Sequence, residues 1–449
     1  MSVTSIKTKA EQAIASQFAS VAPLLPGSGW VPAVREAAMA RFRTQGLPHR
    51  KVEAWKYTDL RGQLKDAFKP ALLEKSGLAT AALDAALGSS LAGLRCIRVV
   101  LLDGSLIRVS APAGYESGNG YILGSLGKLL DADDAGWVRP LLERHERADQ
   151  DRIADLNAAF VTDGAVLRIE PGIALGLPIH LVLATRAGEA QAVSTRNLIE
   201  IGAGASATIL ETHVSLGDGA ARQVNAVTQV RVQDGARLRH IKVLAEGEVA
   251  LHLGSWQVDV GAEARYHGFQ LSESPHLARN QLFLTFEGEG SEAQFNAAFL
   301  GRGQSHLDTT LVIDHTVPRC TSRELVKGVL DGEARGVFQG KVIVREGAQK
   351  SDGKQMAKAL LLSPSAEFDS KPELEILADD VVCGHGSTVA EIDEEQMFYL
   401  RARGIKEAQA RALLIEAFIG EALDTVEDEA IAAALRERAI AWLNAGSTS

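Results

Sequence analysis

The chain has 449 residues, which at about 100–200 residues per domain is enough for two to four domains. Lys and Arg total 47 and Asp and Glu total 57, so the formal net charge is −10 and general binding to nucleic acid is disfavoured. Hydrophobic residues make up 46% and charged residues 23%, which is typical of a globular protein and excludes a disordered chain.

The cysteine content and the hydropathy pattern indicate a cellular compartment. Cys96, Cys320 and Cys383 are too few and too far apart for a disulfide framework, which suits a reducing environment. The first residues lack the apolar core of a secretory signal, and no segment approaches the ~18 apolar residues of a membrane span. We therefore expect a soluble cytoplasmic protein with no membrane partner.

Residues 1–160 are expected to form a helical domain that includes a small hairpin. The first helix is predicted from apolar residues at a spacing of about 3.6, namely Ile6, Ala10, Ile14, Phe18 and Val21. A second helix is expected between Gly29 and Gly46. The run from Cys96 to Val109 places Asp103–Gly104 between two β-branched stretches, a pattern that predicts a hairpin.

Residues 161–392 consist of short alternating runs separated by glycine turns. Five segments align on a glycine, with steps of 31, 26, 29 and 42 residues between Gly204, Gly235, Gly261, Gly290 and Gly332. Irregular repeats of this length favour stacked coils, in which each unit covers the apolar face of the next. The pattern favours a β-solenoid, although alternation alone is also compatible with a β-sandwich.

Residues 393–449 return to a helical pattern and are expected to form a C-terminal helical domain. Asp393 is a suitable N-cap for the first of three short helices. A broad apolar face is predicted on the second helix from Ala410, Leu413, Leu414, Ala417, Phe418 and Leu423. Three short helices are too few for a core of their own, so they must cover the β-region or bind a partner.

Several catalytic classes lack their motif in this chain. The segment 332–342 has the wrong glycine spacing for a phosphate-binding loop, and no Ser or Thr follows Lys341. Neither a GxSxG elbow, an HExxH helix nor a paired CxxC motif occurs. Any nucleotide-driven step would therefore require another subunit.

Most of the eleven histidines lie singly in β-sequence, where a hydrogen-bonded or solvated sheet residue is the ordinary interpretation. Cys383 and His385 are different, because on one strand they project to the same face, roughly 6.5–7 Å apart. Thiolate and imidazole both bind iron, zinc or copper(I), but two donors are only half of a four-ligand set. The pair is either an inert strand end or half of a site that a second chain completes. His315 and Cys320 form a second, weaker pair that we interpret as structural.

The sequence resembles the SufB/SufD family of iron–sulfur cluster assembly scaffolds over nearly its whole length. The strongest likeness lies between residues 310 and 420, in the strings DHTVPRCTSRELVKGVLDGEARGVFQGKV, KPELEI, CGHGSTV and FYLRARGI. LPHRKVEAWKYTDL near the start is similar to the SufD branch. The chain is also short for SufB and lacks the additional cysteines of that branch.

The resemblance implies a right-handed parallel β-helix between helical N- and C-terminal domains. It implies a non-catalytic scaffold subunit that pairs with SufB through the β-helix, with a homodimer as the alternative for the isolated chain. The helices at 405–424 and 427–443 match the end that binds the ATPase SufC, and this chain itself is not expected to bind a nucleotide.

The family's Cys-x-His pair falls on Cys383 and His385, which are thereby expected to hold a transient iron–sulfur cluster shared with SufB. Gly384 replaces the commoner Ser and Ser387 replaces Ala, and neither change removes a ligand. The rival interpretations are a polysaccharide-acting β-helix enzyme and a self-associating structural solenoid. The first needs carboxylates or basic residues grouped on one sheet face, whereas the acidic residues here are scattered.

Overall fold

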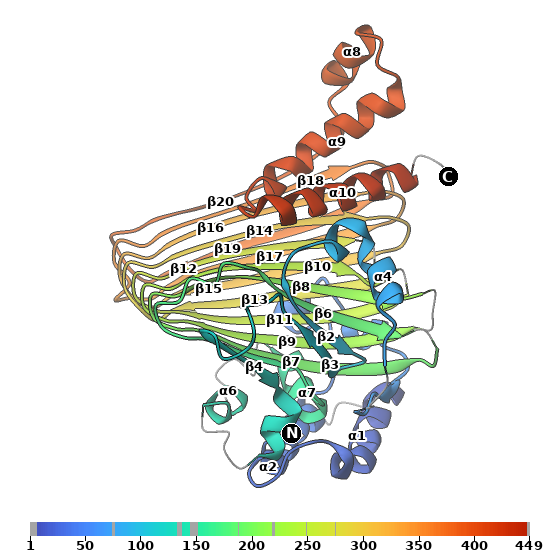
Figure 1. Ribbon diagram of the computed structural model, residues 1–449. Helices are drawn as coiled ribbons and strands as arrows, with labels where there is room; N and C mark the ends of the chain where they lie inside the picture. The colour runs from blue at the N-terminus through green and yellow to red at the C-terminus, as the bar shows by residue number, and fades with distance from the viewer. Residues whose placement is uncertain are drawn as a thin grey trace, which may run out of the picture.

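The computed structural model describes residues 7–73, 77–132, 137–143, 151–186, 188–217, 221–247, 249–273 and 275–446. Its centre is a β-solenoid in which successive strands alternate between two ten-stranded sheets (Figure 1). From β5 (Ala165–Ile169) to β18 (Asp352–Leu361), each strand pairs in parallel with the strand two positions later in the chain, as in a parallel β-helix. The expected β-helix with helices at both ends is confirmed, and the sandwich alternative is excluded.

Sheet A contains β4 (Tyr121–Ser125), β5 (Ala165–Ile169), β7 (Gln191–Ile201), β9 (Arg222–Val232), β11 (Ala250–Val260), β13 (Leu277–Phe286), β15 (His306–His315), β17 (Arg335–Val344) and β19 (Glu367–Ile376), with β1 (Lys69–Pro70) beside β7. Sheet B contains β3 (Ser105–Ser110), β2 (Ile97–Leu102), β6 (Ile179–Arg186), β8 (Ser206–Leu216), β10 (Arg237–Ala245), β12 (Arg265–Glu273), β14 (Glu292–Gly301), β16 (Thr321–Leu330), β18 (Asp352–Leu361) and β20 (Val382–Ala390).

The hydrophobic interior of the solenoid consists of side chains that repeat at the same position of successive coils. One such column runs through sheet A and contains Ile199, Val230, Val258, Leu284, Ile313 and Val342. Because every second residue of a strand points inward, the in-register pairing places apolar residues of successive coils directly on one another. Most of the interior side chains are small or aliphatic, and Tyr121, Trp256, Tyr266 and four phenylalanines lie among them.

The turns from sheet A to sheet B contain a left-handed residue in each of six successive coils. These residues are Gly204, Gly235, Glu263, Gly290, Arg319 and Lys350, all with φ between 55° and 71°. The amide of each donates a hydrogen bond to a carbonyl in the next coil, which stacks the turns.

The glycine alignment predicted from sequence was therefore wrong in two places. In the coil that contains Gly261, the left-handed residue is Glu263, two positions later. Gly332 belongs to the other set of turns, from sheet B back to sheet A, where it stacks on Gly303. The irregular steps arose because non-glycine residues occupy three of the six left-handed positions, at some conformational cost.

The predicted hairpin is confirmed and forms the first edge of the solenoid. β2 and β3 pair antiparallel across Asp103 and Gly104, both of which have positive φ. β2 also pairs in parallel with β6, so the hairpin extends sheet B.

The N-terminal helices lie on the outer face of sheet A. They are α1 (Lys9–Val21), η1 (Ala22–Leu24), α2 (Val31–Gln45), η2 (Glu53–Trp55), α3 (Leu60–Gln63), α5 (Leu126–Asp131), α6 (Arg139–Leu142) and α7 (Arg152–Phe160). Both predicted helices are confirmed, with Ala10, Ile14 and Phe18 buried; Ile6 lies outside the described residues. The domain limits at residues 160 and 392 stay predictions.

Helices α4 (Thr80–Ala92), α9 (Glu407–Leu423) and α10 (Glu429–Gly446) cover sheet B, whereas α8 (Glu394–Ala402) projects away from the solenoid (Figure 1). Asp393 accepts hydrogen bonds from the amides of residues 395 and 396, which confirms the predicted cap. The apolar face predicted for the second C-terminal helix was correct only in part. Ala410 and Leu423 are buried and Phe418 packs beside the sheet, but Ile415 and Ile419 also pack there, and Leu413 is exposed. The helix is apolar on several sides, so periodicity alone did not identify the buried one.

No helix in the described part of the chain is both long and apolar enough to cross a membrane.

Candidate functional site

Cys383 and His385 lie on β20, the outermost strand at the C-terminal end of sheet B (Figure 1). In the register with β18, Cys383 is opposite Gly353 and His385 is opposite Gln355. Among the described residues, no other strand pairs with the remaining edge of β20. The backbone that carries both side chains is therefore accessible to a further strand.

The two residues face the interior side of the sheet at its uncovered end. The Cys383 side chain packs against the hydrophobic interior, and its Sγ is 3.7 Å from where a Cβ on Gly353 would be. Because strand side chains alternate, His385 shares the face of Cys383. Cys383 is half-buried and His385 is exposed, so a ligand can reach both from the open end.

The electrostatics around Cys383 favour the protonated thiol. Burial raises its pKa, and the carboxylate of Asp352 raises it further, against a hydrogen bond from the Gly353 backbone. A metal ion or cluster that binds Sγ must therefore displace a proton. One thiol and one imidazole fit a cluster as an incomplete ligand set, as predicted from the sequence, and their role stays a prediction.

Glu324 is a site residue that the sequence reasoning missed. The register places Glu324 of β16 beside Gln355 of β18, which in turn lies beside His385. Glu324 is buried, its Oε2 has no hydrogen-bond partner, and burial raises its pKa to about 8 in spite of contributions from Ser322 and Arg323. It is therefore mostly a neutral acid at pH 7. In the sequence, Glu324 is two positions after Ser322 on a strand, so the two side chains share a face. This spacing could have indicated a buried acid, but the chain contains many other acidic residues that are equally spaced from small polar ones.

His315 and Cys320 lie in the interior of the solenoid and are fully buried. His315 Nε2 is 3.2 Å from Ser322 Oγ, and burial lowers the pKa of this histidine to about 4. Cys320 Sγ is 3.5 Å from the carbonyl oxygens of Gly288 and Pro318, and burial raises the pKa of its thiol. This placement agrees with their interpretation as structural residues.

The same end of the solenoid exposes apolar side chains on both sheets. Ile376 and Leu377 at the end of β19 are 42% and 54% exposed, and Val382 and Val389 of β20 are 59% and 51% exposed. Apolar side chains along an unpaired strand edge are typical of a surface that pairs with another chain. The edge thus combines hydrogen-bonding backbone, apolar area and the Cys383–His385 pair.

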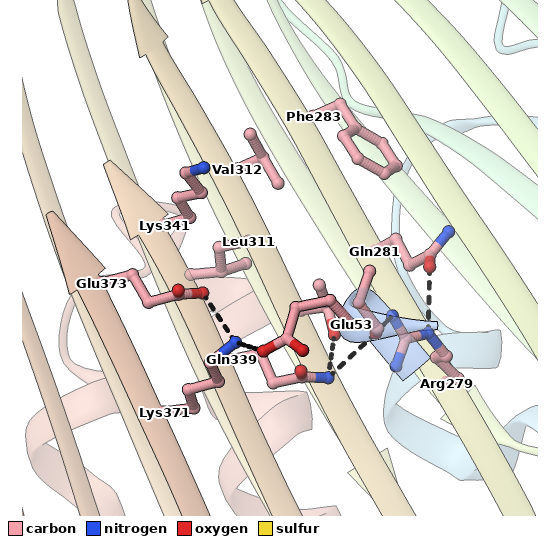
Figure 2. A pocket seen from close by; sticks show the side chains of 13 residues that line it. Glu53, Arg279, Gln281, Phe283, Leu311, Val312, Gln339, Lys341, Lys371 and Glu373 are labelled. Atoms are coloured by element: carbon pink, nitrogen blue, oxygen red, sulfur yellow. Dashed lines mark hydrogen bonds and ion pairs between the residues drawn. The ribbon is translucent and has the colours of Figure 1, made fainter. Parts of the chain in front are cut away.

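A separate cavity of about 220 Å³ lies on the outer face of sheet A, next to η2 (Figure 2). Polar groups at this cavity tie the N-terminal segment to the sheet. Arg279 lies 3.9 Å from the ring centre of Trp55, forms a buried ion pair with Asp308, and donates to the Ala54 carbonyl oxygen. Lys371 pairs with Glu53 of η2 at the rim. The EAWKYTD string is therefore an anchor for the N-terminal segment.

Comparison with known proteins gives the family. Residues 183–418 match the model of the SUF system FeS cluster assembly SufBD core domain, and residues 26–181 match that of the SufBD protein N-terminal region. The chain belongs to the SufBD family and is an iron–sulfur cluster assembly protein.

Individual relatives agree with this assignment. The chain is 31% identical to the iron–sulfur cluster assembly protein SufD of Escherichia coli, over 89% of this chain and 90% of that protein. It is 27% identical to an iron–sulfur cluster assembly SufBD family protein of Synechocystis, over 90% and 89% of the two chains. It is 25% identical to SufD of Bacillus subtilis, over 64% and 65%.

Proposed function

We propose that this protein is a non-catalytic scaffold subunit that forms part of the binding site for a nascent iron–sulfur cluster. The observation that carries the proposal is the position of Cys383 and His385 side by side on an uncovered edge strand. A half set of ligands at an edge suits a cluster that is assembled between two subunits and then released. The cluster is cargo in this scheme and not a resident cofactor.

The partner proposed at this edge is SufB. The free edges of β19 and β20 offer backbone hydrogen-bonding groups, and four exposed apolar side chains offer surface for burial. A second solenoid that aligns its own edge strands would extend both sheets across the subunit boundary. Two copies of this chain can meet in the same way, so a homodimer is the expected alternative when SufB is absent.

The partner proposed for the C-terminal helices is the ATPase SufC. α8 and the start of α9 project from the solenoid (Figure 1). Phe398 and Tyr399 on α8 are 75% and 57% exposed. An exposed aromatic pair on a projecting helix is typical of a binding surface. ATP-driven approach of two SufC subunits would pull on these helices, strain the SufB boundary and uncover Cys383 and His385.

Copurification tests the partner assignments. Tagged full-length protein, expressed with SufB and SufC, should retain both, whereas a polysaccharide-acting enzyme or a self-associating solenoid would retain neither. Replacing both exposed aromatic residues of α8 (F398S/Y399S) should abolish retention of SufC but not of SufB.

A second experiment tests the cluster site within the assembled complex. H385A should leave the complex intact and abolish cluster formation, measured by the visible absorbance of the reconstituted cluster. The matched control is H267A on the same sheet, since His267 is partly exposed and contacts Glu427 instead of the edge. Full cluster yield from H385A would remove this histidine from the mechanism.

A further inference from the structure

A cluster of polar side chains lies inside the solenoid, between β8, β10, β11 and β13. One ligand atom from each of His213, Glu246 and His252 lies within 4.8 Å of the others, and all three residues are buried. The rings of the two histidines meet edge to face with centres 4.7 Å apart. Sequence reasoning treated these histidines as isolated sheet residues, because their proximity arises only when the coils stack.

Each of the two imidazoles is held by a carboxylate. His213 Nε2 is 2.7 Å from Glu211 Oε1, and His252 Nδ1 is 2.7 Å from Glu246 Oε2. When one ring N–H donates a hydrogen bond to a carboxylate, the other ring nitrogen keeps its lone pair free for a metal, which is how proteins orient metal-binding histidines. His213 Nδ1 is buried and has no hydrogen-bond partner.

Gly254 leaves a space beside Lys242, Asn280 and His252. A Cβ at this position would lie 2.5 Å from Lys242 Nζ, 2.7 Å from Asn280 Oδ1 and 2.9 Å from His252 Nε2. Asn280 is buried and its Oδ1 has no hydrogen-bond partner. An unsatisfied amide oxygen and a histidine nitrogen thus converge on a position that only a glycine leaves open.

The Lys242 side chain ends where a bound cation would contact His252 and the acidic groups. Its Nζ is 3.2 Å from His252 Nε2 and 3.7 Å from Glu211 Oε1. The acidic side chains of Glu211 and Glu246 both interact electrostatically with Lys242, so a bound cation would be attracted to the same place. Two histidines and one carboxylate form a donor set that suits divalent iron, cobalt or zinc.

We propose that His213, Glu246 and His252 form a binding site for one divalent first-row transition-metal ion inside the solenoid, and that Lys242 occupies the site when the metal is absent. Glu246 belongs to the connection between β10 and β11, where Val249 is 54% exposed, so the cluster lies directly beneath the surface at this turn. The site does not include Cys383 or His385 and does not depend on the function proposed for them.

Cobalt(II) is the probe, because its visible absorption reports nitrogen and oxygen coordination directly. The experiment uses tag-free, full-length protein that carries C383S/H385A, so that metal bound at the solenoid edge does not contribute. After treatment with a chelator, this protein should bind one Co²⁺ per chain, and zinc should displace it. H213Q and E246Q should each weaken binding by at least roughly tenfold, the scale of losing even an orienting group.

Two further variants keep the test decisive if a ligand variant folds poorly. G254A retains every ligand but places a methyl group within 2.9 Å of His252 Nε2, where the ion would have to bind, so it should also lose Co²⁺ binding. K242M removes the competing ammonium, so it should bind Co²⁺ more tightly and gain more thermal stability from zinc than the background protein. H315N, at a buried histidine outside the cluster, is the matched control and should bind as the background does.

Absence of Co²⁺ binding in the folded background protein would overturn the proposal. So would equal affinity in the background, E246Q and G254A proteins, because the ion would then lie elsewhere.

Discussion

Replacing Glu324 with glutamine should change how the free energy of unfolding depends on pH, and by more than the same replacement of an exposed glutamate. Glu324 is buried, and burial raises its pKa in the folded state to about 8, against 4.5 for an ordinary glutamate side chain. The folded protein therefore binds this proton more tightly than the unfolded chain does. Its contribution to stability is fully present below about pH 4.5 and is lost as the pH rises to about 8.

The size of the effect follows from the shift in pKa. At about 1.4 kcal/mol per pKa unit, the full loss is roughly 5 kcal/mol, of which about 3–4 kcal/mol falls between about pH 5 and about pH 8. E324Q has no proton to lose, so its stability relative to the wild type should rise by that amount over the same range.

Urea unfolding followed by circular dichroism at several pH values measures this difference. E367Q is the matched control, because the Glu367 side chain is 69% exposed, and its difference from the wild type should stay flat. Infrared difference spectra at pH 7 should show a protonated carboxylic acid band in the wild type that E324Q lacks. A constant stability difference between wild type and E324Q from pH 5 to pH 8 would refute the assignment of a neutral buried acid.

Three other predictions concern separate parts of the molecule. D308N should destabilise the protein by about 3–5 kcal/mol, because it leaves Arg279 buried without its charge partner. D314N, at a partly exposed ion pair with Arg345, should cost less than about 1 kcal/mol. Equal midpoints of urea unfolding for the two variants would contradict this. Cluster binding to the complex should weaken by up to about tenfold per pH unit as the pH falls, since the raised pKa of Cys383 means that its thiol must lose a proton to bind. C383S should lack this pH dependence. An unchanged pH profile in C383S would exclude Cys383 as its source. V382S/V389S should weaken association with SufB or a second copy, measured by analytical ultracentrifugation, while unchanged association would place the interface elsewhere.

Much of the fold could be predicted because it depends on local pattern. Alternation and turn glycines indicated stacked coils, and helix caps such as Asp393 identified the C-terminal helices. The left-handed turns at Glu263, Arg319 and Lys350 could not be recognised, because these residues adopt positive φ only under the constraint of the neighbouring coils. Family resemblance, not periodicity, decided between solenoid and sandwich.

The site could be predicted only in part, for a related reason. Cys383 and His385 are two positions apart on one strand, so their common face follows from the sequence alone. Glu324 lies near them through two successive strand pairings, each about thirty residues apart in the chain. His213 and His252 meet across the two sheets of the solenoid. Such proximity depends on the register between coils, which a single sequence does not specify.

The interior of this solenoid contains polar groups that stability alone does not explain. A buried polar atom without a partner costs roughly 1–3 kcal/mol, and apolar residues of similar shape would avoid that cost. His213 Nδ1, Asn280 Oδ1 and Glu324 Oε2 are all buried without a partner. The first two belong to the histidine–carboxylate cluster and the third lies beneath the Cys383–His385 pair. Because most of the surrounding interior is apolar, a chain that only had to fold could have placed apolar side chains at both positions as well.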